Sequence, residues 1–438
     1  MKTQICESES LDAVPVGWKA AKLKYHAELK PKCKTQVTED SEVTFTPMEN
    51  IKNGYFIPGK EKYGMFAGNS QYAEYEEGDI AFAKVTPCFE NDNIAIMQDL
   101  VNGKGFGSSE LFVMRPLDIG IKYLFYLIQS PHFKANGVAS MTGTGGLKRV
   151  SSDAVRNYKF ALPGAKIQNL ISSYLDTKCA EIDKVVEQTR ATIEEYKKLK
   201  QAIITEAVTK GVRGPRPMKP SGVEWIGDIP EEWSKDKIGR VCNLIGSGTT
   251  PKFDRFDLSS ADIPWIQSGD LSSAHLHNVK TYVTRDIIAA HSALKVYEPP
   301  FIAVAMYGAS IGNTSISSFR ACVNQACCVL TPDTFNLSYL YYIIMACKPY
   351  FMYQGEGGGQ PNISQEKIKQ TWIPVPNPIE QQEIATYLDT KCAEIDRIIE
   401  KKEQLIEELG SYKKSLIYEC VTGKMEIKMH NYSQIAIH

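Results

Sequence analysis

The sequence of 438 residues has almost no net charge, no long apolar run and no signal for export. Its 50 Lys and Arg residues nearly balance its 51 Asp and Glu residues, for a net charge of −1. This excludes a uniformly basic, histone-like protein but leaves room for a local basic patch. The longest apolar stretch, Leu337 to Cys347, is interrupted by Ser338 and is far shorter than the roughly 20 residues of a membrane span. The first ten residues lack the apolar segment of a signal peptide. The sequence predicts a soluble cytoplasmic protein with no membrane partner.

The cysteines do not form a disulfide or metal-binding pattern. There are eleven, an odd number, and without a secretory signal they are expected to be free thiols. Cys322, Cys327 and Cys328 are the closest group, but they lack the CxxC spacing and the nearby His of a zinc site. We expect them to be small apolar residues of a buried strand.

The motifs of common nucleotide-dependent enzymes are also missing. The string GTGGLKR from Gly143 has the wrong spacing for a phosphate-binding loop. The glycines from Gly103 to Gly107 lack a strand–helix–strand setting, so a surface loop explains them better. A methyltransferase would need a cofactor loop and an Asn/Asp-Pro-Pro-aromatic motif, and the sequence has neither. It therefore predicts no catalytic residue and no metal site.

What the sequence does contain is an internal repeat. The string YLDTKCAEID occurs unchanged from Tyr174 and again from Tyr387. Weaker similarity precedes each copy, since YEEGDIAFAKVTPCFEN from Tyr75 aligns with YEPPFIAVAMYGASIGN from Tyr297. Pro163 and Gln168 match Pro376 and Gln381, and Trp18 matches Trp233. The chain is therefore predicted to be a tandem duplication of a variable globular unit followed by a shared helix.

Each shared segment has the apolar spacing of a long helix and contains no proline. The first is expected from Ala165 to Thr209, where Gly211 and a Gly- and Pro-rich linker end it. An apolar stripe of this length needs a partner, and the other copy is the closest at hand. The predicted contact residues are Ile182, Val186, Ile193, Leu199, Ile203, Ile395, Ile399, Ile406 and Leu416.

The predicted fold class is α/β, more specifically α+β. Two similar globular domains are joined by two long antiparallel helices that form an intramolecular coiled coil with pseudo-twofold symmetry. Short strands are expected at Ile80 to Val85 and Ile302 to Met306, with neighbours at Leu111 to Met114 and Ala326 to Leu330. One buried helix per domain is expected at Ile121 to Gln129 and Leu337 to Ala346. The predicted segments are a first domain at 1–164, a central helix at 165–210, a linker at 211–222, a second domain at 223–378, a distal helix at 379–424 and a tail at 425–438.

Two similar modules on a rigid spacer suit an extended partner, and B-form DNA repeats its grooves about every 34 Å. Base reading requires Arg, Lys, Gln, Asn, Ser or Thr side chains on elements that enter the major groove. We sought such residues in the glycine-rich loops and at the strand ends. The candidates are Lys84, Thr86, Lys148 and Arg149 in the first unit, and Lys252, Arg255, Gln267, Ser268, Tyr307, Ser310, Gln360 and Asn362 in the second.

From about Val14 to Lys424 the chain resembles the specificity subunit of type I restriction–modification enzymes. The resemblance is carried by both YLDTKCAEID helices and by the strings GDIAFAKVTPCFEN from Gly78, KPSGVEWIGDIPEEW from Lys219, AVAMYGASIGN from Ala303, CVNQACCVL from Cys322 and GGQPNIS from Gly358. One departure is that Leu147-Lys148-Arg149 stands where the second unit has Gln360-Pro361-Asn362.

The resemblance implies two target-recognition domains, each reading one half of a bipartite, asymmetric sequence in double-stranded DNA. The shared helices would set the gap between the half-sites, so four residues inserted into the first helix should lengthen the gap without changing either half. Two methyltransferase (modification) subunits would dock on these helices, and restriction (translocase) subunits would join them. The chain itself would hold no cofactor, since S-adenosylmethionine, ATP and Mg belong to the partner subunits.

Two other functions remain open from the residues alone. A coiled-coil adaptor that binds proteins would show no sequence-dependent contact with DNA. A nuclease with an unfamiliar site would cleave DNA in a metal-dependent reaction, although the sequence shows no carboxylate cluster. The near-neutral charge also has to be explained, because phosphate contacts supply much of the affinity of DNA-binding proteins. We expect partner subunits to provide much of the phosphate contact.

Overall fold

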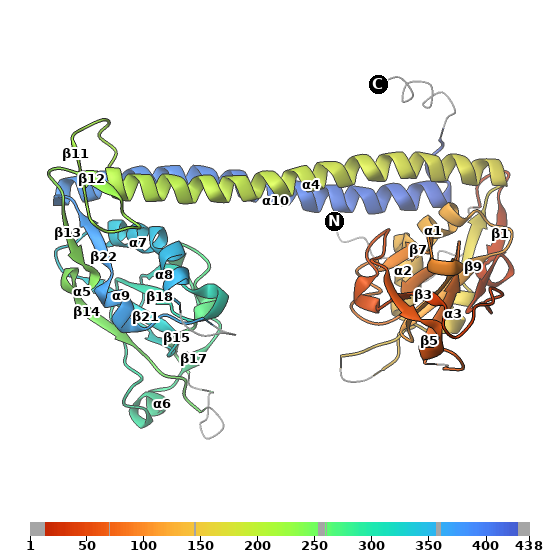
Figure 1. Ribbon diagram of the computed structural model, residues 1–438, viewed down its shortest axis with the longest axis horizontal. Coiled ribbons are helices and arrows are strands. Elements are labelled where there is room, and N and C mark those ends of the chain that lie inside the picture. Colours follow the sequence, from red (N-terminus) through yellow and green to blue (C-terminus); the bar gives the residue numbers. More distant parts are fainter. Residues whose placement is uncertain are drawn as a thin grey trace. The chain divides into compact units, whose positions relative to one another are not determined.

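The computed structural model describes residues 14–69, 71–143, 146–252, 259, 261–355 and 361–427. The chain divides into two compact units, Met1–Thr189 with Gln404–His438 and Arg190–Glu403. Two long helices, α4 (Ala165–Lys210) and α10 (Pro378–Thr422), each contribute one end to each unit. We refer to the two bodies as unit 1 and unit 2 (Figure 1).

Unit 1 contains two four-stranded sheets covered by short helices. The strand orders are β2-β9-β6-β7 and β4-β3-β8-β5, and β1 pairs separately with β10. The first sheet is antiparallel throughout, whereas β3 and β8 in the second sheet are parallel. The strands are β1 (Lys19–Lys22), β2 (Ala27–Leu29), β3 (Glu42–Thr46), β4 (Gly59–Lys62), β5 (Tyr72–Glu76), β6 (Ile80–Ala83), β7 (Ile94–Ile96), β8 (Lys104–Ser108), β9 (Leu111–Pro116) and β10 (Lys159–Leu162), and the short helices are α1 (Ile121–Gln129), α2 (Pro131–Ala139) and α3 (Ser152–Arg156).

Unit 2 repeats this plan with a larger main sheet. The strand orders are β14-β21-β18-β19-β16 and β17-β15-β20, with β13 paired to β22 and β11 to β12. Its strands are β11 (Met218–Pro220), β12 (Asp228–Pro230), β13 (Ser234–Lys237), β14 (Cys242–Ser247), β15 (Ile263–Ile266), β16 (His275–Leu276), β17 (Tyr282–Val283), β18 (Phe301–Ala305), β19 (Thr314–Ser317), β20 (Cys322–Val323), β21 (Cys327–Pro332) and β22 (Trp372–Val375), and its short helices are α5 (Ile238–Val241), α6 (Arg285–Ala290), α7 (Leu337–Ala346), α8 (Lys348–Gln354) and α9 (Gln365–Gln370).

Most of the elements expected from the sequence are present. Helices α1 and α7 have the predicted bounds, and the predicted neighbours β6 with β9 and β18 with β21 form antiparallel pairs. The cysteine group lies in β20 and β21, where all three side chains are fully buried, as expected for small apolar strand residues. Burial raises the pKa of the Cys327 thiol to about 12, so this thiol is neutral at physiological pH.

Gln168 and its counterpart in the repeat, Gln381, make the same hydrogen bonds in the two units. The Gln168 side chain accepts from the backbone N–H of Gly120 (2.7 Å) and donates to the carbonyl of Pro163 (2.9 Å). The Gln381 side chain accepts from the N–H of Asn336 (2.9 Å) and donates to the carbonyl of Pro376 (2.9 Å). In each unit the first turn of a long helix is thereby fastened to the start of α1 or α7.

A tyrosine of α1 and a tyrosine of α7 each attach their globular body to the long helix that ends in the same unit, α10 in unit 1 and α4 in unit 2. The buried hydroxyl of Tyr123 donates to the carbonyl of Val421 in α10 (3.0 Å). At the matching position in unit 2, the hydroxyl of Tyr339 donates to the carbonyl of Val208 in α4 (3.1 Å). Both carbonyls belong to the last turn of their helix, where backbone acceptors have no partner within the helix. The body of each unit therefore caps the end of the helix that it receives.

Within each unit, a segment of α4 runs antiparallel to a segment of α10 (Figure 1). In unit 2, Lys200 pairs with Asp396 (2.6 Å), and one turn earlier in α4, Tyr196 lies 5.9 Å from the ammonium of Lys402, further along α10. In unit 1, Asp183 pairs with Lys413 (2.7 Å), which is the same ion pair with the roles of the two helices exchanged.

The predicted contact residues of the helices differ in burial. Ile182, Ile193, Ile395 and Leu416 are buried, while Val186, Ile203, Ile399 and Ile406 are half-buried. Leu199, which the apolar spacing places in the contact, is 48% exposed, and Ile204 is the fully buried residue of that region. In this region α4 packs against α7 as well as against α10, and Ile204 lies in the core that the three helices share.

The two glycines of the shared segments behave differently. Gly211 follows α4 with φ of 79°, a left-handed conformation that ends a helix and favours glycine. A Cβ at this position would lie 2.0 Å from the guanidinium of Arg216, so the linker could not pack as it does. Gly410 lies inside α10, which continues through it.

Candidate nucleic-acid interface

In unit 1, four of the predicted DNA-contacting residues meet where β6 ends. The chain leaving β6 pairs with the segment before α3, since Val150 N–H donates to the Lys84 carbonyl (2.8 Å) and Thr86 N–H to the Lys148 carbonyl (3.1 Å). An isolated bridge between Val85 and Arg149 lies between these two bonds. We call this arrangement, residues 84–86 with 146–150, the unit 1 junction.

Unit 2 has a junction with the same backbone bonds. Ile363 N–H donates to the Met306 carbonyl (2.9 Å), and Gly308 N–H donates to the Pro361 carbonyl (2.8 Å). The isolated bridge here joins Tyr307 to Asn362. Lys84 therefore corresponds to Met306, and Arg149 to Asn362. We call residues 306–308 with 361–363 the unit 2 junction.

The side chains of the unit 1 junction form a charged cluster around Glu110, which follows β8. Arg149 donates to both carboxylate oxygens of Glu110, from Nε (2.9 Å) and from Nη2 (2.7 Å). Lys84 Nζ lies 3.8 Å from the same carboxylate and donates to the carbonyl of Ser109 (2.6 Å). The Arg149 hydrogen bonds lower the pKa of Glu110, and burial lowers the pKa of Lys84.

Thr86 fixes the loop that carries Lys148 and Arg149. Its hydroxyl donates to the carbonyl of Gly146 (3.0 Å) and accepts from the backbone N–H of Lys148 (3.0 Å). The side chains of Lys148 and Arg149 are exposed. Thr86 is thus occupied in holding the loop, while Lys148 and Arg149 can reach a ligand.

The unit 2 junction has no charged side chain at the matching places. Met306 is buried, Tyr307 is 43% exposed, and Asn362 is exposed. Ala326, whose carbonyl accepts from Met306 N–H (2.8 Å), takes the place of Glu110, whose carbonyl accepts from Lys84 N–H (3.0 Å). Ser310 donates its hydroxyl to the Tyr307 carbonyl (2.7 Å). Tyr307 and Asn362 are the exposed polar side chains of this junction.

The other predicted residues of unit 2 lie elsewhere. Gln267, at the end of β15, donates from its amide to the hydroxyl of Thr281 (2.9 Å) and caps the short 3₁₀ turn Ser268–Asp270. Lys252 is exposed in the segment after β14. Arg255 and Gln360 lie outside the described residues. The structure therefore groups Lys84, Thr86, Lys148 and Arg149 in one place, and Tyr307, Ser310 and Asn362 in another.

Glu110 was missed by sequence reasoning. It is a single acidic residue after Ser108 and Ser109, and nothing in its spacing distinguishes it from a solvated turn. Its role depends on the pairing of β6 with β9, which brings the turn before β9 to the end of β6.

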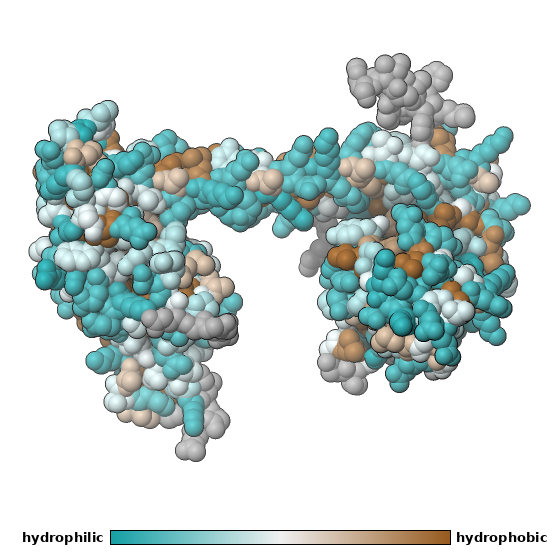
Figure 2. Space-filling model, in the orientation of Figure 1, coloured by the Kyte–Doolittle hydropathy of each residue, from teal (hydrophilic) through white to brown (hydrophobic). Residues whose placement is uncertain are grey.

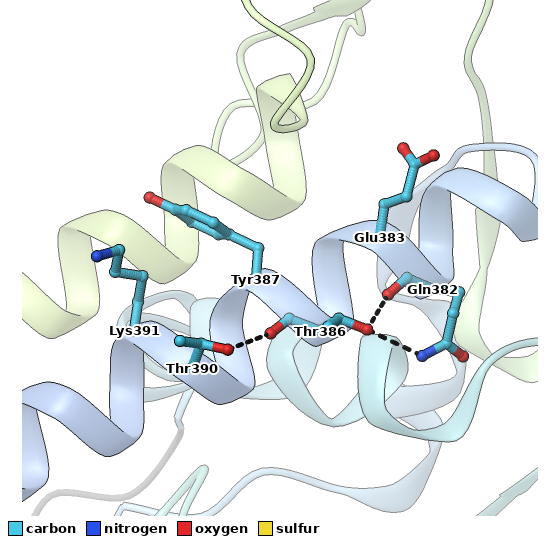
Figure 3. A pocket seen from close by; sticks show the side chains of 6 residues that line it. All are labelled: Gln382, Glu383, Thr386, Tyr387, Thr390 and Lys391. Atoms are coloured by element: carbon cyan, nitrogen blue, oxygen red, sulfur yellow. Dashed lines mark hydrogen bonds between the residues drawn. The ribbon is translucent and has the colours of Figure 1, made fainter.

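The surface of α10 in unit 2 has a hollow of about 480 Å³. Figure 3 draws the side chains that line it. It is lined by Gln382, Glu383, Thr386, Tyr387, Thr390 and Lys391. The hydroxyl of Thr386 donates to the Gln382 carbonyl and that of Thr390 to the Thr386 carbonyl, which leaves Tyr387 and Lys391 as the prominent side chains. Tyr387 is 39% exposed. Tyr387 and Lys391 belong to the repeated string, so α4 has Tyr174 and Lys178 at the same positions.

Figure 2 shows mostly hydrophilic surface on both units. Among the described residues there is no group of three or more His, Cys, Asp or Glu side chains placed to bind a metal ion. No helix in the described ranges combines the length and the apolar character that crossing a membrane requires.

Comparison with known proteins agrees with the resemblance noted from the sequence. Residues 230–408 match the family model described as the type I restriction modification DNA specificity domain. The chain is 31% identical over 207 residues to the EcoEI specificity subunit of Escherichia coli, which covers 46% of this chain and 34% of that protein. It is 24% identical over 322 residues to the MjaVIII specificity subunit of Methanocaldococcus jannaschii, with 71% of each protein covered. The chain thus spans about a third of the length of the E. coli relative.

Solved structures show the same fold. A chain from a structure of the type I R-M system, solved in work on its complex assembly and conformational transition, matches with a TM-score of 0.72 at 19% identity and covers 94% of this chain and 100% of that one. The HsdS subunit of Thermoanaerobacter tengcongensis matches with a TM-score of 0.51 at 19% identity, over 94% of this chain and 98% of that one. Residues 230–408 are thus similar to the type I restriction modification DNA specificity domain, and parts of the chain are similar to type I restriction enzyme specificity subunits.

Proposed function

We propose that this chain is the DNA sequence-recognition subunit of a type I restriction–modification complex. Unit 1 reads one half of a bipartite, asymmetric target in double-stranded DNA, and unit 2 reads the other. The chain itself catalyses no step. Methyl transfer, with S-adenosylmethionine, and ATP- and Mg-dependent restriction take place in partner subunits, in the cytoplasm where the genomic DNA is.

The observation that carries this proposal is the pair of matched junctions. Their backbone hydrogen bonds are the same, but their exposed side chains are Lys148 and Arg149 in one and Tyr307 and Asn362 in the other. A constant frame with different polar side chains is suited to reading two different short sequences, because base recognition depends on the donors and acceptors that each loop presents. An enzyme duplicated for catalysis would instead keep the same reactive groups in both copies.

The proposal also includes the docking of two methyltransferase subunits on the long helices. Tyr387 and Lys391 recur in the sequence as Tyr174 and Lys178, although Tyr174 is half-buried where Tyr387 is 39% exposed. In both copies the lysine pairs with a glutamate three residues on, Glu394 (2.9 Å) and Glu181 (2.8 Å). Two identical partner subunits require two equivalent surfaces. The antiparallel helix contact in each unit likewise supports helices that set the length of the gap in the target.

Sequencing of methylated adenines in the source genome, with and without this gene, tests the proposal. We expect a two-part motif with an unspecified gap in the wild type and loss of its methylation in the deletion strain. Unchanged methylation after deletion would contradict the function. The purified chain should bind such a duplex more tightly with its methyltransferase partner than alone, because the 50 Lys and Arg residues of the chain are balanced by 51 Asp and Glu residues, which repel phosphates.

A further inference from the structure

The two junctions differ in charge although their backbones match. The unit 1 junction brings Lys84, Glu110 and Arg149 together, whereas Met306, Ala326 and Asn362 stand at the matching places in unit 2. A DNA half-site placed on unit 1 would therefore meet three cations, Lys84, Lys148 and Arg149, and one carboxylate, and one placed on unit 2 would meet neutral groups.

The geometry of Arg149 leaves part of its guanidinium available. Glu110 accepts from Nε and Nη2, and no hydrogen bond from Nη1 to a described residue is found. The side chain is 47% exposed. An Arg held at one edge of its fork presents the remaining N–H groups in a fixed direction, which suits recognition of a planar pair of acceptors or of a phosphate.

The carboxylate of Glu110 is itself unsuited to contact phosphates. Its pKa is lowered by the Arg149 hydrogen bonds, so it is ionised at neutral pH. Its side chain is 25% exposed, less than that of Arg149, and it faces two cations of its own unit. An ionised carboxylate near a binding surface weakens DNA affinity by charge alone. Its presence is explained if it orients the cations that make the contact.

We propose that Glu110 is a positioning residue that holds Arg149, with Lys84 beside it, against hydrogen-bond acceptors of the first half-site, either phosphate oxygens or the edge of a guanine. The second half-site is contacted by neutral side chains, Tyr307 and Asn362. This inference rests on the proposed function, since it assigns the means by which each unit holds its half of the DNA.

The test uses the complete complex of this chain with its methyltransferase partner and a duplex that carries both half-sites. Binding is measured over a range of KCl concentrations for the wild type and for Glu110→Gln, Arg149→Lys and Asn362→Ala. Glu110→Gln removes a negative charge, so charge alone predicts tighter binding. We expect roughly tenfold weaker binding instead, because the Arg149 fork is no longer fixed. Arg149→Lys, which keeps the charge and loses the fork, should weaken binding similarly.

The readouts separate the two acceptors. If Arg149 contacts a phosphate, Arg149→Ala lowers the slope of log affinity against log salt by about 1 and weakens all sequences equally. If it contacts a guanine, discrimination falls at one base pair of the first half-site. Asn362→Ala should affect the second half-site and leave the salt slope unchanged.

The outcomes that overturn the inference are also distinct. Folded Glu110→Gln and Arg149→Lys complexes that bind as tightly as the wild type, with the same discrimination, would exclude a positioning role. Weakening by Glu110→Gln at the second half-site alone would exclude the assignment to unit 1. Failure of the wild-type complex to prefer the two-part site would instead contradict the proposed function.

Discussion

At the scale of single residues, unit 2 contains a carboxylate that is fully enclosed. Glu380, in the first turn of α10, is 0% exposed and forms an ion pair with Arg216 of the linker (2.5 Å). It also accepts from the indole N–H of Trp233 (3.0 Å). The matching residue of unit 1 is Ile167, which is 40% exposed. The linker that follows α4 is thus fastened to α10 by a charge pair that the first copy lacks.

Replacement of Glu380 by Gln should destabilise the chain by about 3 kcal/mol, because it leaves the largely buried guanidinium of Arg216 without its main counter-charge. The thermal unfolding midpoint measures the effect. Glu383→Gln is the matched control, since Glu383 pairs with Arg213 at a surface where both side chains are 43% exposed. The control should melt like the wild type. Equal melting of the two variants would show that Glu380 contributes no more than a surface ion pair.

At the scale of the elements, burial along the long helices predicts which apolar residues matter. Leu416 is 1% exposed and packs in the core of unit 1, whereas Leu199 is 48% exposed. We expect Leu416→Ala to lower the free energy of unfolding by about 3 kcal/mol, and Leu199→Ala to change it by less than about 0.5 kcal/mol. Urea denaturation followed by circular dichroism distinguishes these values. A large effect at Leu199 would contradict its exposure and would support the helix contact that the apolar spacing alone predicted for this residue.

The repeated ion pairs between α4 and α10 allow an internal comparison. Asp183 with Lys413 and Asp396 with Lys200 have the same geometry, and each pair joins a largely exposed carboxylate to a lysine that is about one-fifth exposed. Double-mutant cycles with alanine should give a coupling of about 0.5 kcal/mol for each pair. The two couplings should agree, because the repeat places each pair in the same surroundings. Coupling in one unit and none in the other would show that the helix contacts are not equivalent.

The elements were largely predictable from the sequence, whereas the site was predictable only in part. Helices α1 and α7 and the β6–β9 and β18–β21 pairs follow from local apolar patterns bounded by turn residues. The loop cations Lys148 and Arg149 were chosen because the repeat aligns the glycine-rich loops of the two units, and the structure shows that both are exposed. Glu110 could not be found, because its partner is 39 residues away in the sequence and only the sheet pairing brings them together. Gln267 was chosen by residue type; its amide donates to Thr281, and its contact with DNA stays a prediction.

At the scale of the whole molecule, the duplication separates what varies from what is kept. The junction side chains differ between the copies, while the contacts that attach each body to the long helices are repeated. Tyr126 donates to Asp176 (2.8 Å) in unit 1, and Tyr342 donates to Asp389 (2.7 Å) in unit 2. The Tyr123 and Tyr339 bonds to the helix ends follow the same rule. Recognition loops can then change without altering the helices, because the two sets of contacts share no residue.

A domain exchange tests this separation. Replacing residues 14–162 by the corresponding domain of a relative with another target should change the first half-site of the methylation motif and leave the second half-site and the gap as they were. Adenine methylation sequencing in a host that carries the chimera is the measurement. A change in both half-sites, or in the gap, would contradict independent reading by the two units.

The exchange should succeed only if the incoming domain keeps both tyrosine contacts with the helices. Tyr123 is fully buried and its hydroxyl satisfies a carbonyl in the last turn of α10, so Tyr123→Phe leaves that acceptor unpaired. We expect a loss of about 1 kcal/mol for Tyr123→Phe, a similar loss for Tyr339→Phe, and a larger loss when Tyr123 and Tyr126 are both changed. Thermal unfolding of the chimeras, with phenylalanine or tyrosine at these two positions, gives the values. If chimeras that lack both hydroxyls are as stable as the parent, then the attachment of each body depends on apolar packing alone, and the tyrosine bonds are a consequence of that packing and not its cause.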